Sequence, residues 1–584
     1  MKVTPMMLIF LQKETIPALA AGVALLVFGR GDALAQVRPD AGRIQQELER
    51  GRVPGLVPPP PGAPVVEEPR RPALAAPAAR FFFIKGFRIT RSTAFAEVEL
   101  LALLKDFIDK ELSLADLERA ADVITRFYRD HGYFIARAYV PAQDIKDGIV
   151  EITVLEGKLD RLSLKLAYEI RLKESVVEET LRAALPADGL IRLEELERGL
   201  LLLNDIPGVD VHSVLLPGSA LGTSIVAVEV NEGPLVSGIL DFDNYGSKFA
   251  GPFRLGSTVN LNDPSGYGDL LSLRATASEG TSYGRLAYQI PVGSSGLRLG
   301  GAYAETRYKL CCEFASLQAR GEAQTATFNA QYPFVRGRNA NLYGTAAYDA
   351  KHYFNETIAG TTSDKKANVV GLGVNGDSSD FLGDGGLSSF GVAVSSGQLN
   401  LDGWAPDRVA DAASARTHGS YSKTAYSMAR LQRLGGTTSL YAGLSGQFAS
   451  RNLDSSEKFI LGGPLGVRGY PTGEAAGDEG LLLNLEFRYD IQPALQFAAF
   501  IDHGEIRLHR NEWAGWQGTN TLISNRYGLS GLGVALNWNQ PGNFLFRASV
   551  AQRIGENRGR DANGNDSDNT KNRIRLWLQV MKFL

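Results

Sequence analysis

The sequence predicts an exported protein in which two small α+β domains precede a large membrane-spanning β-barrel. Three observations support this fold class. The chain opens with a segment typical of secretion, two consecutive stretches mix helix and strand patterns, and from about residue 235 only short alternating strands remain. With 64 glycines and only 2 cysteines in 584 residues, the composition also suits a large, turn-rich β protein.

The N-terminal segment has the order of a secretory signal peptide. Lys2 and Lys13 accompany an apolar run over residues 16–28, and the small residues Ala33 and Ala35 follow it. This run of about 13 residues is shorter than the roughly 20 that a membrane-spanning helix needs. We therefore predict a signal peptide over residues 1–35 and prefer it to a membrane anchor.

Residues 36–52 and 53–80 form two further segments before the first domain. The stretch 40–50 contains good helix formers but only Ile44 and Leu48 as apolar anchors, which predicts a short, mostly polar helix without a core of its own. The next segment is dense in proline, including residues 58–61, and favours an extended, semi-rigid linker.

Two α+β domains of about 75 residues follow, over residues 81–157 and 158–234. In the first we expect a strand at 81–89, a helix at 114–133 and strands at 135–141 and 148–157. In the second we expect a strand at 159–166, helices at 176–185 and 193–206, and strands at 211–218 and 224–233. One face of the first helix, formed by Leu117, Ala121, Ile124 and Tyr128, should pack on the sheet.

Residues 235–584 show the period of two that is typical of half-buried strands. In the stretch 325–332, Ala326, Phe328 and Tyr332 alternate with polar residues, so the two sets face opposite sides. About 350 residues, at roughly 20 to 25 per strand and connection, give about 14 to 18 strands, and we predict 16 antiparallel strands. A soluble β-sandwich is the alternative, but it would divide into smaller domains. An exported barrel of this kind belongs in the bacterial outer membrane, with the α+β domains in the periplasm.

Several classes of function find no support in the sequence. The net charge of −3 argues against a nucleic-acid partner. The six histidines lack metal-ligand spacing, no GxSxG motif occurs, and Gly371, Gly373 and Gly376 match GxGxxG only within a barrel segment. We therefore expect no enzyme activity, cofactor or metal. Cys311 and Cys312 are adjacent, so we interpret them as barrel-wall residues that point to opposite faces.

Four segments, in order along the chain, carry distinctive turn and charge residues. The first domain contains Gly132, Tyr133, Pro141, Gln143, Asp144, Gly148, Glu156 and Gly157. The second domain contains Asn204, Asp205, Pro207, Gly208, Pro217, Gly218 and Gly222. The start of the barrel contains Asn244, Gly246, Gly251, Pro264, Gly266, Gly268 and Asp269. Near the C-terminus are Val467, Arg468, Gly469 and Tyr470, followed by Phe500, Ile501, Asp502 and Gly504.

Together these segments resemble the TpsB-type two-partner secretion transporters, the haemolysin-activator family of the POTRA-barrel superfamily. The resemblance runs from about residue 37 to 584. It implies two periplasmic POTRA domains, an outer-membrane barrel, and a plug helix within residues 36–52. The implied function is translocation of a large exoprotein, captured unfolded through its N-terminal secretion domain. Lipid of the outer membrane and, during biogenesis, the barrel-assembly machinery are the other implied partners.

The resemblance also implies site residues. The loop with Val467, Arg468, Gly469 and Tyr470 should fold inward so that Arg468 contacts Asp502. Strand parity supports this, because Asp502 and Glu486 fall on the lumen side of alternating strands. We infer that Glu486 is a second partner of Arg468. The alternative is that Arg468 is an exposed arginine in a turn.

The motif residues of the first domain, from Gly132 to Gly157, are implied to serve client docking, although glycine and proline there could simply form turns. An assembly factor for outer-membrane proteins is the alternative function, since relatives in the superfamily share the loop motif. A passive diffusion porin is a third possibility, but it would need neither the periplasmic domains nor the inward loop.

Overall fold

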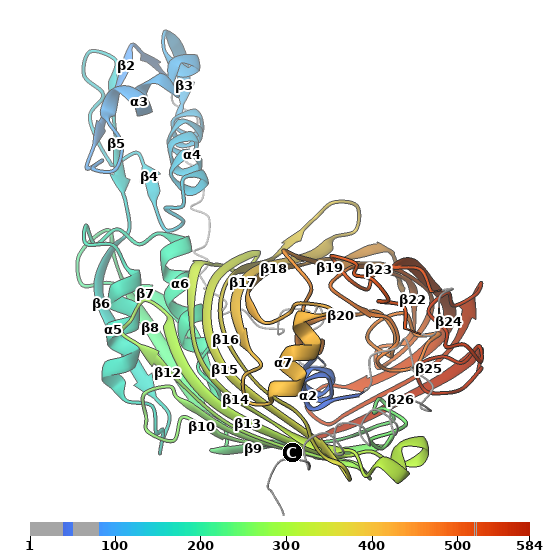
Figure 1. The fold of residues 1–584 in the computed structure, drawn as a ribbon. Coiled ribbons are helices and arrows are strands. Elements are labelled where there is room, and N and C mark those ends of the chain that lie inside the picture. The colour runs from blue at the N-terminus through green and yellow to red at the C-terminus, as the bar shows by residue number, and fades with distance from the viewer. Residues whose placement is uncertain (1–38, 51–80, 519, 521–522) are drawn as a thin grey trace, which may run out of the picture.

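The computed structural model describes residues 39–50, 81–518, 520 and 523–584. They form an arm of two α+β domains (residues 81–234), a closed barrel, and a short helix, α2 (Ala41–Arg50), inside the barrel (Figure 1). The predicted signal peptide and proline-rich linker lie outside the described residues. None of the described helices is both long and apolar enough to cross a membrane.

The first domain (residues 81–157) has a three-stranded sheet and a separate two-stranded ribbon. The sheet order is β2-β5-β4, with β2 (Gly86–Thr90) parallel to β5 (Ile149–Leu155) and β4 (Arg137–Tyr139) antiparallel to it. The ribbon pairs β1 (Phe81–Ile84) with β3 (Lys110–Ser113). The prediction of one strand over 81–89 was therefore wrong: the chain changes partner at Lys85, whose N–H donates to the carbonyl of Gly148.

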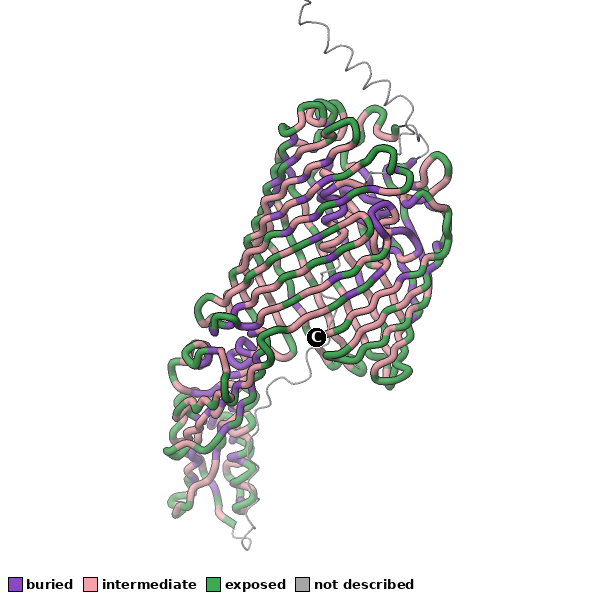
Figure 2. Tube along the Cα trace, turned by 90° about the horizontal axis from the view of Figure 1, so that it is seen from below, coloured by how far each residue is buried: buried purple, intermediate pink, exposed green. Residues whose placement is uncertain are grey.

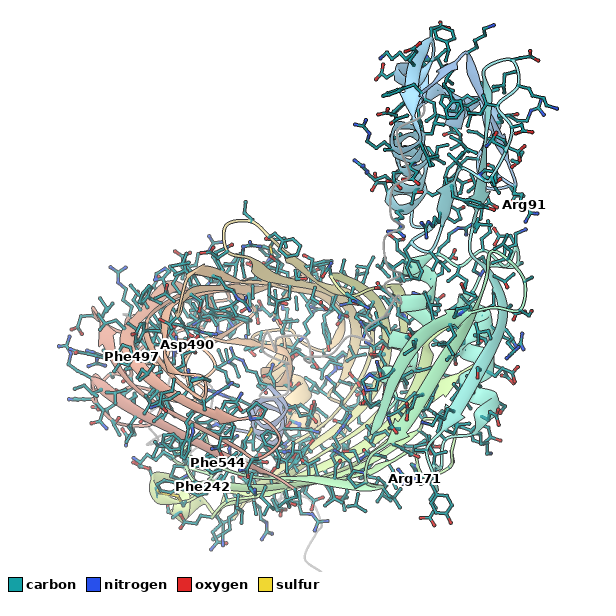
Figure 3. All side chains as sticks on the ribbon, turned by 180° about the vertical axis from the view of Figure 1, so that it is seen from behind. Arg91, Arg171, Phe242, Asp490, Phe497 and Phe544 are labelled. Carbon is teal, nitrogen blue, oxygen red and sulfur yellow. A yellow bond between two sulfur atoms is a disulfide. The ribbon has the colours of Figure 1, made fainter. Side chains whose placement is uncertain are left out.

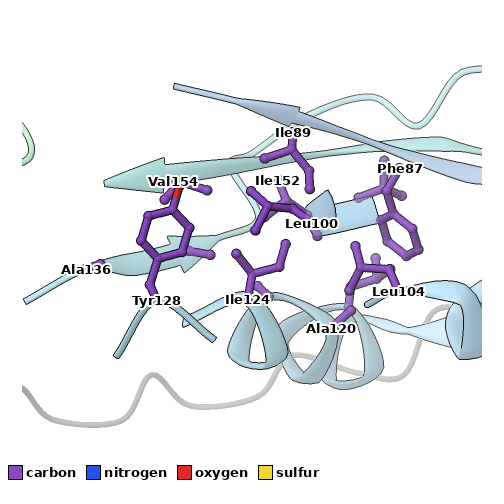
Figure 4. Close-up of a cluster of buried hydrophobic side chains, with 14 of the residues drawn as sticks. Phe87, Ile89, Leu100, Leu104, Ala120, Ile124, Tyr128, Ala136, Ile152 and Val154 are labelled. Atoms are coloured by element: carbon purple, nitrogen blue, oxygen red, sulfur yellow. The ribbon is translucent and has the colours of Figure 1, made fainter. Parts of the chain in front are cut away.

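Helix α4 (Leu114–Asp130) covers one face of this sheet. Ser113 and Asp116 form a capping box that starts the helix by satisfying its first N–H groups. The side chains of Leu117, Ile124 and Tyr128 are at most 1% exposed, as the helical spacing predicted. Figure 4 shows Ile124 and Tyr128 projecting from the helix toward Ile152 and Val154 of β5. The domain is completed by α3 (Glu97–Ala102) and the 3-10 helix η2 (Lys105–Phe107).

The second domain (residues 158–234) repeats this plan. Its sheet order is β6-β8-β7, with β6 (Lys158–Leu166) parallel to β8 (Thr223–Glu232) and β7 (Val209–Pro217) antiparallel to it. Helices α5 (Glu174–Ala184) and α6 (Leu193–Asn204) pack on the sheet through a core that includes Leu181, Leu200 and Val228.

The barrel closes with sixteen antiparallel strands, which confirms the predicted fold class and strand number. Strand β26 pairs with β9, and every other strand pairs with its neighbours in the chain order. The strands are β9 (Val236–Asp243), β10 (Arg254–Asn262), β11 (Leu270–Ala277), β12 (Thr281–Val292), β13 (Leu297–Lys309), β14 (Arg320–Arg336), β15 (Ala340–Thr357), β16 (Gly360–Asp380), β17 (Gly386–Asn400), β18 (Gly419–Gly435), β19 (Thr438–Ala449), β22 (Glu479–Gln492), β23 (Leu495–Arg507), β24 (Arg526–Gln540), β25 (Phe544–Ile554) and β26 (Ile574–Phe583).

Alternation along the strands gives the barrel an apolar outer surface. Phe328 is 67% exposed, whereas the neighbouring Thr325 of the same strand is buried. Phe242 and Phe497, labelled in Figure 3, are also exposed wall residues. A wall that presents large apolar side chains outward suits a lipid environment.

The connections at the two ends of the barrel differ in length. The arm leads directly into the start of β9, which identifies the end of the barrel nearest the arm. The turns at this end are short, such as residues 293–296. The opposite end carries the long loops, including residues 401–418 with α7 (Ala405–Ala412), 450–478 and 555–573. Figure 2 shows buried segments gathered inside the barrel toward this end.

The two cysteines lie in one of these loops. Cys311 and Cys312 follow the end of β13 and are bonded to each other, just at the start of the 3-10 helix η3 (Cys312–Leu317). The interpretation of both as barrel-wall residues was therefore wrong. Off the strand, the two side chains are no longer directed to opposite faces, and the chain adopts a positive φ of 61° at Cys312.

Candidate functional site

The connection between β19 and β22 (residues 450–478) folds into the barrel. It is the sixth loop at the end away from the arm, and we call it the sixth loop. A small ribbon of β20 (Phe459–Ile460) and β21 (Ala476–Gly477) gives it internal structure, and a bridge joins Gly462 to Val467. Most residues of the loop are buried, so it is a packed element of the lumen.

Arg468 in this loop is held by Asp502 on β23. Its Nε lies 2.9 Å from Oδ2 of Asp502 and its Nη2 lies 2.7 Å from Oδ1. The backbone N–H of Arg468 also donates to Oδ2, at 3.0 Å. The Asp502 side chain is fully buried, so removal of either charged partner should cost about 3 kcal/mol or more.

The neighbouring wall strand β22 completes the surroundings of this arginine. Nη1 of Arg468 lies 2.7 Å from Oε1 of Glu486, whose other oxygen accepts from Arg488 at 2.8 Å. Asn484 donates from Nδ2 to both Asp502 (2.7 Å) and the carbonyl of Gly466 (3.2 Å). The structure thus brings together the three charged residues that the sequence singled out, with Asn484 as an additional bridge.

Apolar and aromatic contacts fix the rest of the motif. The guanidinium of Arg468 lies 3.4 Å from the centre of the Phe500 ring, and Trp577 donates to the Arg468 carbonyl at 2.8 Å. Val467 and Tyr470 are fully buried. A Cβ on Gly469 would lie 2.9 Å from the backbone nitrogen of Arg553, so only glycine lets the loop approach the wall this closely.

Helix α2 lies beside the sixth loop in the lumen. The helix has no core of its own, and its first half is buried against the barrel: Ile44 packs in a cluster with Phe249, Tyr308 and Tyr353. Gly42 lies against Ser456, since a Cβ on this glycine would come within 2.6 Å of the serine Cβ. The barrel wall and the loop thus supply the apolar surface that the helix lacks.

Polar contacts join the helix to the sixth loop directly. Asp40 accepts a hydrogen bond from Ser455, and the guanidinium of Arg43 donates to the carbonyl of Gly473. Gln46 donates to the carbonyl of Lys458 at 2.8 Å. A displaced helix would therefore leave polar groups on the loop and on the wall to bond with water instead.

Sequence reasoning missed a second set of charges in the sixth loop. Lys365 on β16 pairs with Asp454 at 2.7 Å and with Asp40, which directly precedes α2, at 3.4 Å. Glu457 lies between Lys351 (2.7 Å) and Lys423 (2.8 Å), both on the wall. The alternation of these strands could have indicated the side on which the lysines lie, but nothing in the sequence shows that their partners come from a loop far along the chain. Within the described part of the chain, no group of His, Cys, Asp and Glu could hold a metal ion.

Comparison with protein families identifies this arrangement. Residues 222–537 match the model of the haemolysin secretion/activation protein ShlB/FhaC/HecB, and residues 82–157 match the ShlB-type POTRA domain. The chain belongs to the ShlB/FhaC/HecB family. The resemblance deduced from the four motifs is thereby confirmed, and the protein is an outer-membrane transporter of the two-partner secretion type.

Individual relatives agree over nearly the whole chain. The heme/hemopexin transporter protein HuxB of Haemophilus influenzae (strain 86-028NP) is 27% identical over 579 residues, which cover 97% of this chain and 98% of HuxB. The hemolysin transporter protein HpmB of Proteus mirabilis is 25% identical and matches 78% of this chain and 80% of HpmB. Among solved structures, CdiB from Escherichia coli shares the fold, with a TM-score of 0.68, 17% identity, and coverage of 97% and 98% of the two chains.

Three of the eight motif residues of the first domain lie where this domain meets the second. The carbonyl of Gly132 accepts from the N–H of Leu193 at 3.0 Å, and that of Gly157 accepts from Ile191 at 3.2 Å. The hydroxyl of Tyr133 lies 3.3 Å from Nε of Arg192. These three residues therefore hold the two POTRA domains together, a role that the sequence did not reveal.

The other motif residues shape a turn. Gln143 exchanges hydrogen bonds with the backbone of Glu151, at 2.7 and 2.8 Å, and its amide nitrogen also lies 3.3 Å from the carbonyl of Pro141. Gly148 has a φ of 76°, and a Cβ added to it would lie 2.9 Å from the carbonyl oxygen of Phe83. Asp144 is exposed on the same turn. Their predicted part in client docking stays a prediction.

Glu156 is a buried acceptor in the core of the first domain. Its carboxylate accepts from the N–H groups of Thr93 (2.6 Å) and Ala94 (2.7 Å) and from the hydroxyl of Tyr128 (2.9 Å). Burial by itself would raise the pKa of this carboxyl, but the hydrogen bonds from Thr93, Ala94 and Tyr128 outweigh it and lower the pKa. The ionised form therefore stabilises the fold.

We predict that this contribution disappears in acid. A lowered pKa in the folded state means that the stabilisation is complete above the ordinary carboxyl pKa of 4.5 and is lost as the pH falls below it. Hydrogen exchange of the Thr93 and Ala94 amides should be faster in Glu156→Gln at neutral pH, and the difference from the parent should shrink below pH 4.5. Glu118→Gln, on the exposed face of α4, is the control. A difference that stays constant with pH would contradict the assignment.

Proposed function

We propose that this transporter captures its exoprotein partner unfolded on the periplasmic arm and passes it through the barrel lumen. The observation that supports the proposal is the way the lumen is occupied. Among the described residues, helix α2 and the sixth loop lie there, each attached in part by an apolar cluster and in part by ion pairs and hydrogen bonds to polar groups. Such contacts can exchange for water when a client enters.

The arm offers an open sheet edge and exposed apolar side chains to an extended client. Strand β2 lies at the edge of its sheet, where backbone groups can pair with an added strand. Phe81 and Phe83 on β1 are 63% and 51% exposed and offer apolar contacts close by. We propose that the motif residues Pro141, Gln143 and Asp144 shape this surface, and that folding of the partner outside the cell provides direction without nucleotide hydrolysis.

We assign to Arg468, Asp502 and Glu486 the role of holding the sixth loop in a transport-competent position. Val467, Gly469 and Tyr470 fit the loop against the wall in support of this. Assembly of outer-membrane proteins is not favoured as the function, because HuxB, which matches over nearly the full length, and HpmB, which matches 78% of this chain, are named as transporters.

Secretion itself tests the proposal. Deletion of this chain should remove one large exported protein from the culture medium, which identifies the partner. Restoring the chain as Arg468→Ala should leave export of that protein reduced about tenfold or more, because the loop loses a buried charge-assisted anchor.

Arg488→Ala is the matched control, since Arg488 also bonds to Glu486 in the lumen but lies on the wall, outside the loop. It should retain export within about twofold of the parent. A change of this size corresponds to much less free energy than the loss of one buried ion pair. Heat-modifiable migration should show all barrels assembled. Equal export by the two arginine variants would count against the loop anchor, and no change in the medium on deletion would count against two-partner secretion by this chain.

Helix α2 should act as a plug that restricts the passage of ions through the lumen. Deleting Asp40–Arg50 should raise single-channel conductance in planar bilayers while leaving export intact, because the helix fills part of the lumen but is not attached by the Arg468 anchor. Glu49→Gln, which keeps the size of the side chain and its contact with Tyr283, should leave the conductance unchanged. Unchanged conductance after the deletion would remove the plug assignment.

A further inference from the structure

Two of the motifs found in the sequence meet at a single joint between the arm and the barrel. One motif includes Asp205 and Gly208 after helix α6, and the other includes Gly266 and Gly268 in the turn between β10 and β11. A Cβ on Gly268 would lie 3.2 Å from the side chain of Ile206. The two segments therefore form the two halves of one contact, although about 60 residues separate them in the chain.

Asp205 is the centre of this joint. Its carboxylate is bound by Arg336 at the end of β14 through two hydrogen bonds, Nε to Oδ2 at 2.9 Å and Nη2 to Oδ1 at 2.7 Å. Arg298 on β13 donates to its backbone carbonyl. Nη1 of Arg336 is fixed in turn by Asn341, at 2.9 Å. Two-point binding of this kind sets direction as well as distance.

The position of Asp205 argues against a role in stabilising its own helix. It is the C-cap of α6, where the helix dipole disfavours a negative charge. Arg336 and Arg298 offset this cost only when the second domain is seated on the barrel. An acidic residue here is therefore explained by the joint and not by the helix.

Two further contacts prevent rotation about this centre. Arg198 on α6 donates to the carbonyl of Pro333 at 2.9 Å and to that of Ser295 at 3.3 Å. Glu197 pairs with Arg338 at 2.9 Å. These contacts reach the turns that follow β12 and β14.

A third attachment lies near the start of α5. The N–H of Lys173 donates to the carbonyl of Gly266 at 3.0 Å, and its ammonium group lies 3.4 Å from the centre of the Tyr267 ring. Arg171, labelled in Figure 3 at the base of the second domain, also lies close to this turn, since a Cβ on Gly266 would come within 2.6 Å of its carbonyl oxygen. Contacts with three successive turns define one orientation of the arm.

We infer that Asp205 and Arg336 are positioning residues for transport. They fix the second domain over the rim formed by β10 to β15, to one side of the barrel mouth, as Figure 1 shows. A client held on the arm is then presented to the lumen from a constant direction. The link to transport rests on the function proposed above, whereas the orientation of the arm can be measured without a client.

The test uses the full-length chain in detergent micelles. Spin labels are attached through non-canonical residues at Leu221 of the second domain and Ile491 near the arm end of β22, which are 67% and 49% exposed. Double electron–electron resonance should give one narrow distance distribution for the parent. Asp205→Ala and Arg336→Ala should each lose the narrow peak, and the double variant should be no broader than the single variants.

Arg430→Ala is the matched control. Arg430 also binds an aspartate, Asp380, through two hydrogen bonds, from Nη1 at 2.8 Å and from Nη2 at 3.1 Å, on strands β18 and β16 at the arm end of the barrel, away from the joint. Its distance distribution should equal that of the parent. If the alanine variants fail to assemble, Arg336→Lys keeps the charge but loses the two-point contact, and it should broaden the distribution to an intermediate degree.

The outcomes separate this inference from the proposed function. Unchanged distances in Asp205→Ala and Arg336→Ala would overturn the positioning role and leave two-partner secretion standing. Broadened distances accompanied by a loss of export, with both properties normal in Arg430→Ala, are the expected result. Broadened distances with normal export would overturn the link between arm orientation and transport.

Discussion

A cation inside the lumen needs a fixed partner, and the paired carboxylates around Arg468 meet this need. Asp502 and Glu486 come from the adjacent strands β23 and β22, so the register of these strands sets the spacing of the two charges. A slip by one residue would turn both carboxylates toward lipid. The position of the sixth loop therefore depends on the correct closure of the barrel wall, and the other contacts in the lumen depend on the loop.

Helix α2 illustrates this dependence. It lies against the barrel through Ile44, and its polar groups bond both to the wall, through Thr325 and Tyr283, and to the sixth loop, through Ser455, Lys458 and Gly473. Binding of the helix and the inward position of the loop therefore stabilise each other, although the Arg468 anchor holds the loop without any contact from the helix. The arm is attached at the opposite end of the barrel through Asp205, independently of this network.

The features that follow from local periodicity could be predicted from the sequence. Alternation placed Asp502 and Glu486 in the lumen, and helical spacing identified the buried face of α4. The break at Lys85, the bonded pair Cys311 and Cys312, and the joints made by Gly132 and Asp205 could not be predicted. The break and the joints depend on which distant segment supplies the partner, such as Gly148 for Lys85 or Arg336 for Asp205, and periodicity carries no information about that choice.

The inward position of the sixth loop depends most directly on the coupling between Arg468 and Asp502. Thermal unfolding of the purified barrel in micelles should be measured for the parent, Arg468→Ala, Asp502→Ala and the double variant. We expect the double variant to lose much less stability than the sum of the two single losses, because both substitutions break the same contact. Losses that add to within about 0.5 kcal/mol would show that the two groups act independently, and would contradict the inward anchor on which this description of the lumen is built.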